Sequence, residues 1–129
     1  MSAHSAVYEI DATTRTPRIL LDAEKSVFIL EGESYPEDVV SFFAPLQAAL
    51  DDMFNAGPVE LAVQVRLVYF NSSSARMLME IMTTLGHAAE NGHRISVNWF
   101  CDPDDDIMRE FAEDIFEDIE AITVEIIDS

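Results

Sequence analysis

The sequence has few basic residues. Seven Lys and Arg residues stand against 25 Asp and Glu residues, and the formal net charge is −18. Such an acidic surface repels the phosphates of nucleic acids and of anionic lipid headgroups. This argues against a nucleic-acid or membrane-surface partner and favours binding to proteins, basic ones in particular.

Cysteines and long apolar runs are also scarce. Cys101 is the single cysteine, which excludes an intrachain disulfide and favours the reducing cytoplasm. No apolar run approaches the ~18 residues that a membrane span requires, and the first residues lack the basic and apolar regions of a signal peptide. We therefore expect a cytoplasmic protein without membrane insertion.

The pattern of apolar residues predicts a single α/β domain. A hairpin over residues 18–31 precedes three helix–strand units, an order that indicates a mixed sheet with parallel β-α-β units. We expect residues 1–15 to form an N-terminal strand or tail and residues 16–129 to form the domain. The long strand over 59–70 has one continuous apolar face. Its other face begins polar and ends with Val68 and Phe70, so we expect that face to be covered only at its C-terminal end.

A run of serines lies between that strand and the next predicted helix. Asn71, Ser72 or Ser73 can cap the helix, because a side-chain oxygen there accepts a backbone N–H bond. The same unpaired N–H groups would also receive a phosphate placed on a serine. Arg76, one turn into the helix, is the nearest cation along the sequence. The residues alone leave both interpretations open, a structural cap and a phosphorylation switch.

Two groups of residues suggest a metal site or a catalytic site, but neither meets the requirements of such a site. Asp102, Asp104, Asp106 and Glu113 match ligand positions of a calcium loop, but Ile107 occupies the position that requires glycine. A serine hydrolase needs its base within hydrogen-bond reach of the serine, whereas His87 lies 13 residues beyond Ser74, about 20 Å along the helix. We therefore predict no catalytic residue, no metal site and no cofactor.

Three segments together resemble the SiaC family of bacterial regulatory phosphoproteins. They are the element around Tyr35-Pro36-Glu37, the element Leu67-Val68-Tyr69-Phe70-Asn71-Ser72-Ser73-Ser74, and Val97-Asn98-Trp99-Phe100 followed by an acidic helix. The resemblance runs from Thr16 onward in the right order and spacing. It implies a STAS-like domain, similar to anti-sigma-factor antagonists.

The resemblance also implies a mechanism. In this family a dedicated kinase phosphorylates the first hydroxyl after the Asn, a metal-dependent phosphatase of the PP2C type removes the phosphate, and the unmodified form binds and activates a diguanylate cyclase. The acceptor then falls on Ser72, where the family usually has Thr; Asp38 and Cys101 also depart from the family pattern. We expect the partner-binding residues to be Tyr35, Pro36, Glu37, Tyr69, Asn71, Ser73, Ser74 and Arg76.

Other functions remain open on the residues alone. Ser34 and Glu37 have the spacing of a helix capping box, which would explain them without any partner. The chain could be a constitutive acidic interaction module that is never phosphorylated. An enzyme with a carboxylate site in the acidic helix would need an acid with a raised pKa in a pocket, which the sequence does not indicate.

Overall fold

Two strands precede an alternation of strands and helices in the computed structural model, which describes residues 7–129. The strands are β1 (Val7–Ile10), β2 (Arg18–Asp22), β3 (Val27–Ser34), β4 (Glu60–Phe70), β5 (Arg94–Cys101) and β6 (Thr123–Asp128). The helices are α1 (Val39–Asn55), α2 (Ser72–Glu90) and α3 (Asp106–Glu117). None of these helices is long and apolar enough to cross a bilayer.

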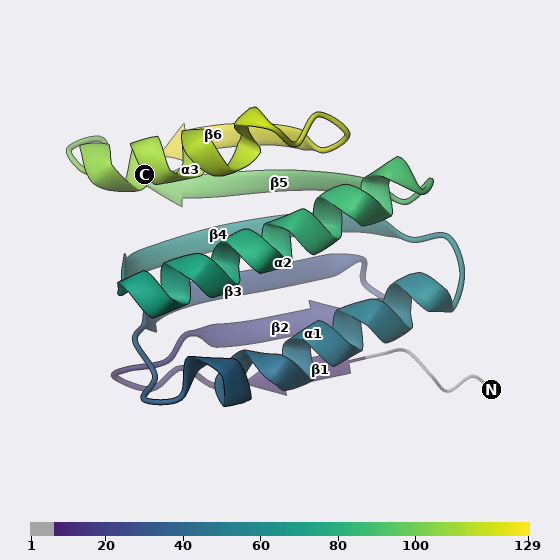
Figure 1. The fold of residues 1–129 in the computed structure, drawn as a ribbon, viewed down its shortest axis with the longest axis horizontal. Coiled ribbons are helices and arrows are strands. Elements are labelled where there is room, and N and C mark those ends of the chain that lie inside the picture. Colours follow the sequence, from purple (N-terminus) through teal and green to yellow (C-terminus); the bar gives the residue numbers. More distant parts are fainter. Residues whose placement is uncertain (1–6) are drawn as a thin grey trace.

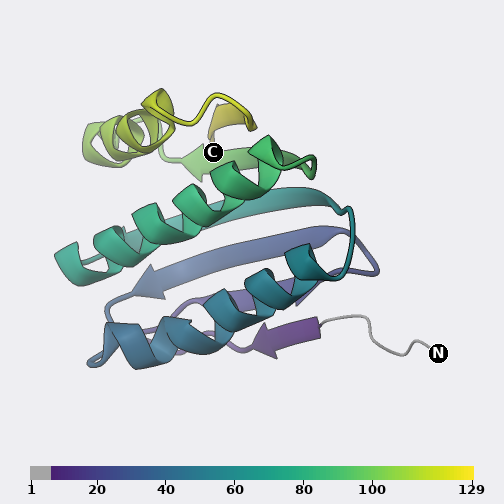
Figure 2. The ribbon, with the colours of Figure 1, turned by 45° about the vertical axis from the view of Figure 1, so that its right-hand side comes forward.

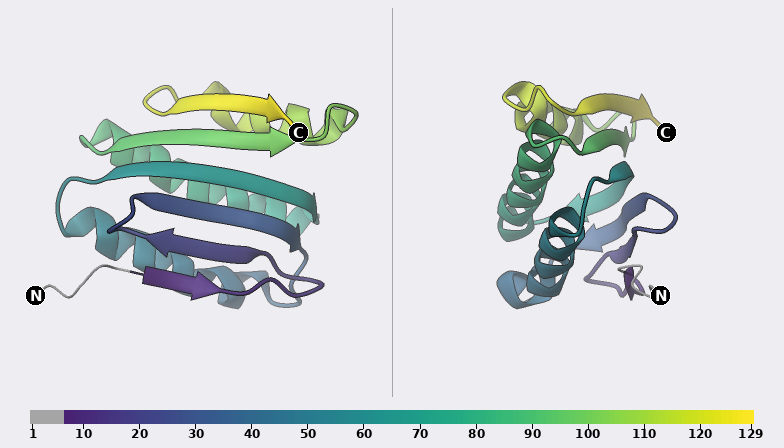
Figure 3. Two further views of the ribbon diagram at one scale, coloured as in Figure 1. Left: turned by 180° about the vertical axis from the view of Figure 1, so that it is seen from behind. Right: turned by 90° about the vertical axis from the view of Figure 1, so that its right-hand side faces the viewer.

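The six strands form one sheet whose spatial order follows the chain, β1 to β6. The first three strands pair antiparallel, and β3 to β6 pair parallel. Because β-α-β crossovers are right-handed and each one advances in the same direction across the sheet, all three helices lie on the same face (Figures 1 and 3). The predicted mixed α/β sheet, with its hairpin and three helix–strand units, is confirmed.

The N-terminal boundary differs from the expected one. Strand β1 pairs with β2, Tyr8 opposite Leu21 and Ile10 opposite Ile19, and the rings and methyl groups of Tyr8 and Ile10 pack against the core. Residues 7–10 therefore belong to the sheet, so that Thr16 does not separate a tail from the domain. Residues 1–6 of the expected N-terminal strand or tail lie outside the described residues.

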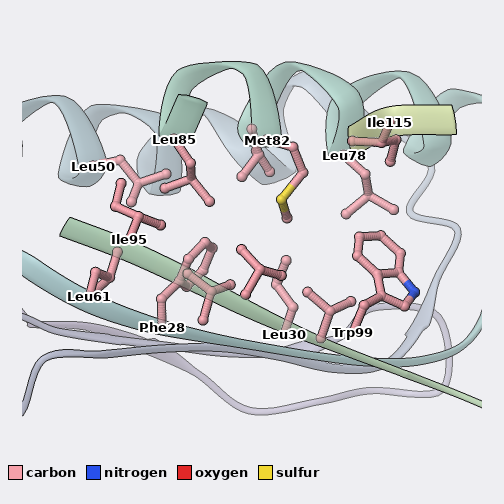
Figure 4. Close-up of a cluster of buried hydrophobic side chains, with 14 of the residues drawn as sticks. Phe28, Leu30, Leu50, Leu61, Leu78, Met82, Leu85, Ile95, Trp99 and Ile115 are labelled. Atoms are coloured by element: carbon pink, nitrogen blue, oxygen red, sulfur yellow. The ribbon is translucent and has the colours of Figure 1, made fainter. Parts of the chain in front are cut away.

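The core fills the single layer between the sheet and the helices. Leu50 of α1, Leu78, Met82 and Leu85 of α2 and Ile115 of α3 pack on side chains from the inner strands (Figure 4). Figure 2 shows α1 and α2 side by side, with α1 over the β1–β3 side of the sheet, α2 over its middle, and α3 over β5 and β6. The fully buried strand residues in this close-up include Phe28, Leu30, Leu61 and Trp99.

A β-bulge near the end of β4 changes which side chains face the core. Gly32 pairs with Leu67 but Glu33 pairs with Tyr69, so Val68 is an extra residue in the ladder. Beyond the bulge the alternation is reversed: Phe70 packs against Phe111 of α3 at a ring-centroid distance of 4.7 Å, whereas Tyr69 is 52% exposed. The expectation that Val68 is covered is wrong, since this side chain is 74% exposed on the face without helices.

Gly86 of α2 lies so close to Ile119, in the segment after α3, that a larger side chain at position 86 should lower the stability. A Cβ at Gly86 would lie 2.9 Å from Ile119 Cγ2. Helix propensity alone would favour alanine by up to ~1 kcal/mol, but overpacking typically costs ~1–3 kcal/mol. We expect Gly86→Ala to lower the free energy of unfolding measured by urea denaturation. In an Ile119→Ala background the same substitution should be stabilising, because the clash is gone; destabilisation in both backgrounds would contradict this explanation.

Candidate functional site

Ser72 is the first residue of α2 and is exposed to solvent. Asn71 caps the helix: its backbone is extended and its side-chain oxygen accepts the Ser74 N–H at 2.9 Å. The N–H groups of Ser72 and Ser73 point out of the first turn and have no acceptor within the helix. The predicted junction of strand, serines and helix is therefore confirmed, with Asn71 as the cap and Ser72 free to carry another group.

Ser74 lies in the interior rather than on the surface. Ser34, the last residue of β3, and Ser74 are both fully buried, and the Ser34 hydroxyl donates to Ser74 Oγ at 2.9 Å. The Asn71 N–H donates to the Ser34 carbonyl at 3.2 Å. These bonds hold the start of α2 against the end of β3. The side chain of Ser74, one of the expected partner-binding residues, has no exposed surface.

The buried serine pair predicts a coupled loss of stability. Ser74→Ala leaves the Ser34 hydroxyl without its acceptor, and an unsatisfied buried polar group costs ~1–3 kcal/mol. The double variant Ser34→Ala/Ser74→Ala removes both groups and should lose less than the sum of the two single variants. Urea denaturation of the four proteins measures this coupling, with exposed Ser73→Ala as the control. Additive losses would show that the two hydroxyls do not interact.

Tyr35 and Tyr69 join the two predicted partner-binding elements. Their rings meet edge to face with centroids 5.6 Å apart. The Tyr35 hydroxyl donates to the Thr14 carbonyl at 2.8 Å, and its backbone N–H donates to the Arg15 carbonyl at 2.7 Å. The β1–β2 loop therefore meets the ends of β3 and β4, beside the start of α2. We call this end of the sheet, where β3 and β4 finish, the edge.

The capping-box interpretation of Ser34 and Glu37 is wrong. Ser34 is part of β3, and Asp38 caps α1 by accepting the Ser41 N–H at 3.1 Å. Hydrogen bonds from the Ser41 backbone and hydroxyl lower the pKa of Asp38 below its usual value. Glu37 is exposed and Pro36 is half-buried in the turn between β3 and α1. Both remain available to a partner, because the helix cap does not use them.

Two exposed arginines lie at the same edge, and the sequence indicated only one of them, Arg76. Arg76 is exposed and follows Ser72 by four residues, so the two side chains share one face of α2. Arg15 is exposed as well, and the Tyr35–Arg15 backbone bond brings its loop to the same edge. No signal in the sequence places Arg15 beside Tyr35, because this contact depends on how the β1–β2 loop folds back.

The chemical alternatives find no support within residues 7–129. Cys101 is buried, and burial raises the pKa of its thiol; Arg109 opposes this shift and nearby carboxylates such as Asp128 add to it, so that a reactive thiolate is disfavoured. Asp105 caps α3 and Asp106 begins this helix, so the acidic segment forms a helix start rather than a calcium loop. In this part of the chain no group of three or more His, Cys, Asp or Glu side chains is arranged to hold a metal ion.

The chain is a two-layer α/β domain that presents an exposed serine at a helix N-terminus. The family model of the SiaC family regulatory phosphoproteins matches residues 10–129, and the chain belongs to this family. An uncharacterized protein of Pseudomonas aeruginosa strain UCBPP-PA14 is 30% identical over 109 residues, which are 84% of this chain and 86% of the relative.

Solved structures of SiaC from Pseudomonas aeruginosa share the fold. The apo form superposes with a TM-score of 0.87 at 28% identity, over 94% of this chain and 98% of that one. A second structure, of the diguanylate cyclase SiaD in complex with its activator SiaC, contains a chain that matches with a TM-score of 0.88 at 28% identity, over 95% of this chain and 99% of that one. That relative therefore activates an enzyme by binding to it.

Proposed function

We propose that this protein is a phosphorylation-controlled activator of a diguanylate cyclase. The form with an unmodified Ser72 binds and activates the cyclase, a dedicated kinase phosphorylates Ser72, and a PP2C-type phosphatase restores the active form. The chain itself catalyses no reaction and acts through its partners in the cytoplasm, where ATP and GTP are available to the kinase and the cyclase.

The observation that carries this proposal is the placement of Ser72. Its side chain is exposed, whereas the nearby Ser74 is buried, so a kinase can reach Ser72 without unfolding the helix. The free N–H groups of the first turn and the positive end of the helix dipole can receive a phosphate. The first turn of α2 contains no acidic residue that would compete for them. Serine in place of the usual threonine retains the hydroxyl on which the chemistry depends.

Phosphopeptide mapping tests the assignment directly. The full chain is incubated with its cognate kinase and ATP, and the modified peptides are identified by mass spectrometry. We expect one phosphate, on Ser72, which the phosphatase removes. Ser72→Ala should abolish the modification, and Ser73→Ala, its exposed neighbour, should leave it intact. Phosphate confined to Ser73 or to another region would overturn the assignment.

A further inference from the structure

A pocket opens at the carboxyl end of the sheet, beside the start of α3. The pocket has a volume of about 520 Å³ and lies where β4 and β5 end and α3 begins. Its walls include Val68 of β4, Phe100 of β5, Met108 of α3 and the carboxylates of Asp104 and Asp105. We call it the β4–α3 pocket. Its size is within the range of cavities that bind ligands or partner side chains.

Apolar side chains stand exposed around this pocket. The bulge in β4 leaves Val68 74% exposed at its wall. Ile107, next to the pocket residue Met108 in the first turn of α3, is 82% exposed. Single exposed apolar side chains are ordinary on a protein surface. Val68 at the pocket wall and Ile107, one residue before the wall residue Met108, are the two most exposed large apolar side chains of residues 7–129, and such exposure is typical of a surface that a partner covers.

The charges of the pocket favour a cationic occupant. Asp102 accepts the Asp104 N–H and Asp105 accepts the Met108 N–H, so both carboxylates are held at the rim. Asp104 is exposed and has no side-chain partner among the described residues. The Phe100 ring already carries the Arg66 guanidinium 3.6 Å from its centroid, which shows that this ring accepts a cation on its face.

The same charges disfavour nucleotides. Asp102, Asp104 and Asp105 outnumber Arg66 at the pocket, and these carboxylates and the formal net charge of −18 repel phosphate groups, including those of a cyclase's product. A basic segment of a protein is attracted by this field and can pair with Asp104 while its apolar side chains cover Val68 and Ile107.

We propose that the β4–α3 pocket receives an apolar segment bearing arginine or lysine from the diguanylate cyclase. This inference rests on the proposed function for the identity of the partner, but not on the phosphorylation of Ser72. Val68 and Ser72 are four residues apart at the carboxyl end of β4. One partner can therefore contact the pocket and the edge that carries the phosphoacceptor.

Calorimetric titration of the unmodified full chain with the diguanylate cyclase of the same organism tests the pocket. Val68→Lys and Ile107→Lys should each weaken binding at least tenfold, because each removes an apolar contact and adds a charge that repels the basic segment. The matched control is Ala62→Lys: Ala62 is exposed on the same face of the same strand, six residues before Val68 and about 20 Å away. Thermal denaturation verifies that all variants are folded.

A second set of variants tests how much the negative charge of Asp104 contributes to the affinity for the cyclase. Asp104→Lys should weaken binding at least tenfold, Asp104→Asn by a smaller factor, and Glu60→Lys, at the far end of β4, should leave it unchanged. Wild-type affinity in Val68→Lys and Ile107→Lys would overturn the proposal, as would an equal loss in Ala62→Lys. Binding of cyclic di-GMP to the unmodified protein that Val68→Lys alters would also overturn the assigned occupant. If the unmodified wild-type chain binds no cyclase, the proposed function itself fails, and this outcome is seen before any variant is compared.

Discussion

Phosphate on Ser72 is expected to weaken the complex with the diguanylate cyclase at least 100-fold. An unmodified serine can be buried against a partner with its hydroxyl bonded, but a phosphate dianion buried without a matching cation costs several kcal/mol. About 3 kcal/mol already corresponds to a 100-fold loss of affinity. Ser72→Ala should retain binding and resist the kinase, and Ser72→Asp should weaken binding less than phosphate does. Calorimetry at fixed salt measures the affinities, because salt screens the interactions of a chain this acidic.

The melting temperature of the protein provides a control for the predicted loss of affinity. A negative charge at the start of α2 interacts favourably with the helix dipole, so phosphorylation and Ser72→Asp should leave the melting temperature unchanged or raise it. Weaker binding together with a lower melting temperature would point to unfolding rather than switching. Ser73→Asp places the same charge one residue further along, and its effect on affinity should be smaller. Equal affinity of the phosphorylated and unmodified proteins would reject the switch and favour a constitutive acidic interaction module.

The second large effect is expected at Trp99, on the core side of β5. The side chain has no exposed surface, and its ring lies 6.0 Å, between centroids, from both Phe111 and Phe116 of α3. Trp99→Ala should cost ~3–5 kcal/mol, because it removes a large buried ring and leaves a cavity. Domains of this kind have ~5–15 kcal/mol of total stability, so the variant should unfold at a much lower urea concentration.

Trp99→Phe tests whether the indole N–H contributes to stability in addition to the packing of the ring. The indole Nε1 is buried and has no hydrogen-bond partner in the described part of the chain. Losing this N–H therefore removes no bond, and the phenyl ring retains most of the packing. We expect Trp99→Phe to cost less than half as much as Trp99→Ala in urea denaturation. Equal costs would show that the N–H makes a bond on which the core depends.

The two parts of the candidate site differ in how far the sequence predicts them. Asn71 and the serines were placed correctly at the start of a helix, because capping is a local interaction between residues three apart. The division of roles between exposed Ser72 and buried Ser74 was not predictable, since Ser74 is buried by Ser34, 40 residues earlier in the chain. The position of Arg15 and the Tyr35–Tyr69 contact could not be predicted either, because each depends on segments that are distant in the sequence.

The sequence by itself determined the order of strands and helices, the inward-facing residues of β4 ahead of its bulge, and the acidic surface. Each of these follows from local periodicity, caps and composition, which depend on neighbouring residues. Only the tertiary structure decided that every helix covers one face of the sheet and that the ends of β4 and β5 and the start of α3 enclose the β4–α3 pocket. The bulge at Val68 is likewise a product of strand pairing: β3 shifts register against β4 at Gly32, and an alternation that looks regular in the sequence turns Tyr69 outward and Phe70 inward.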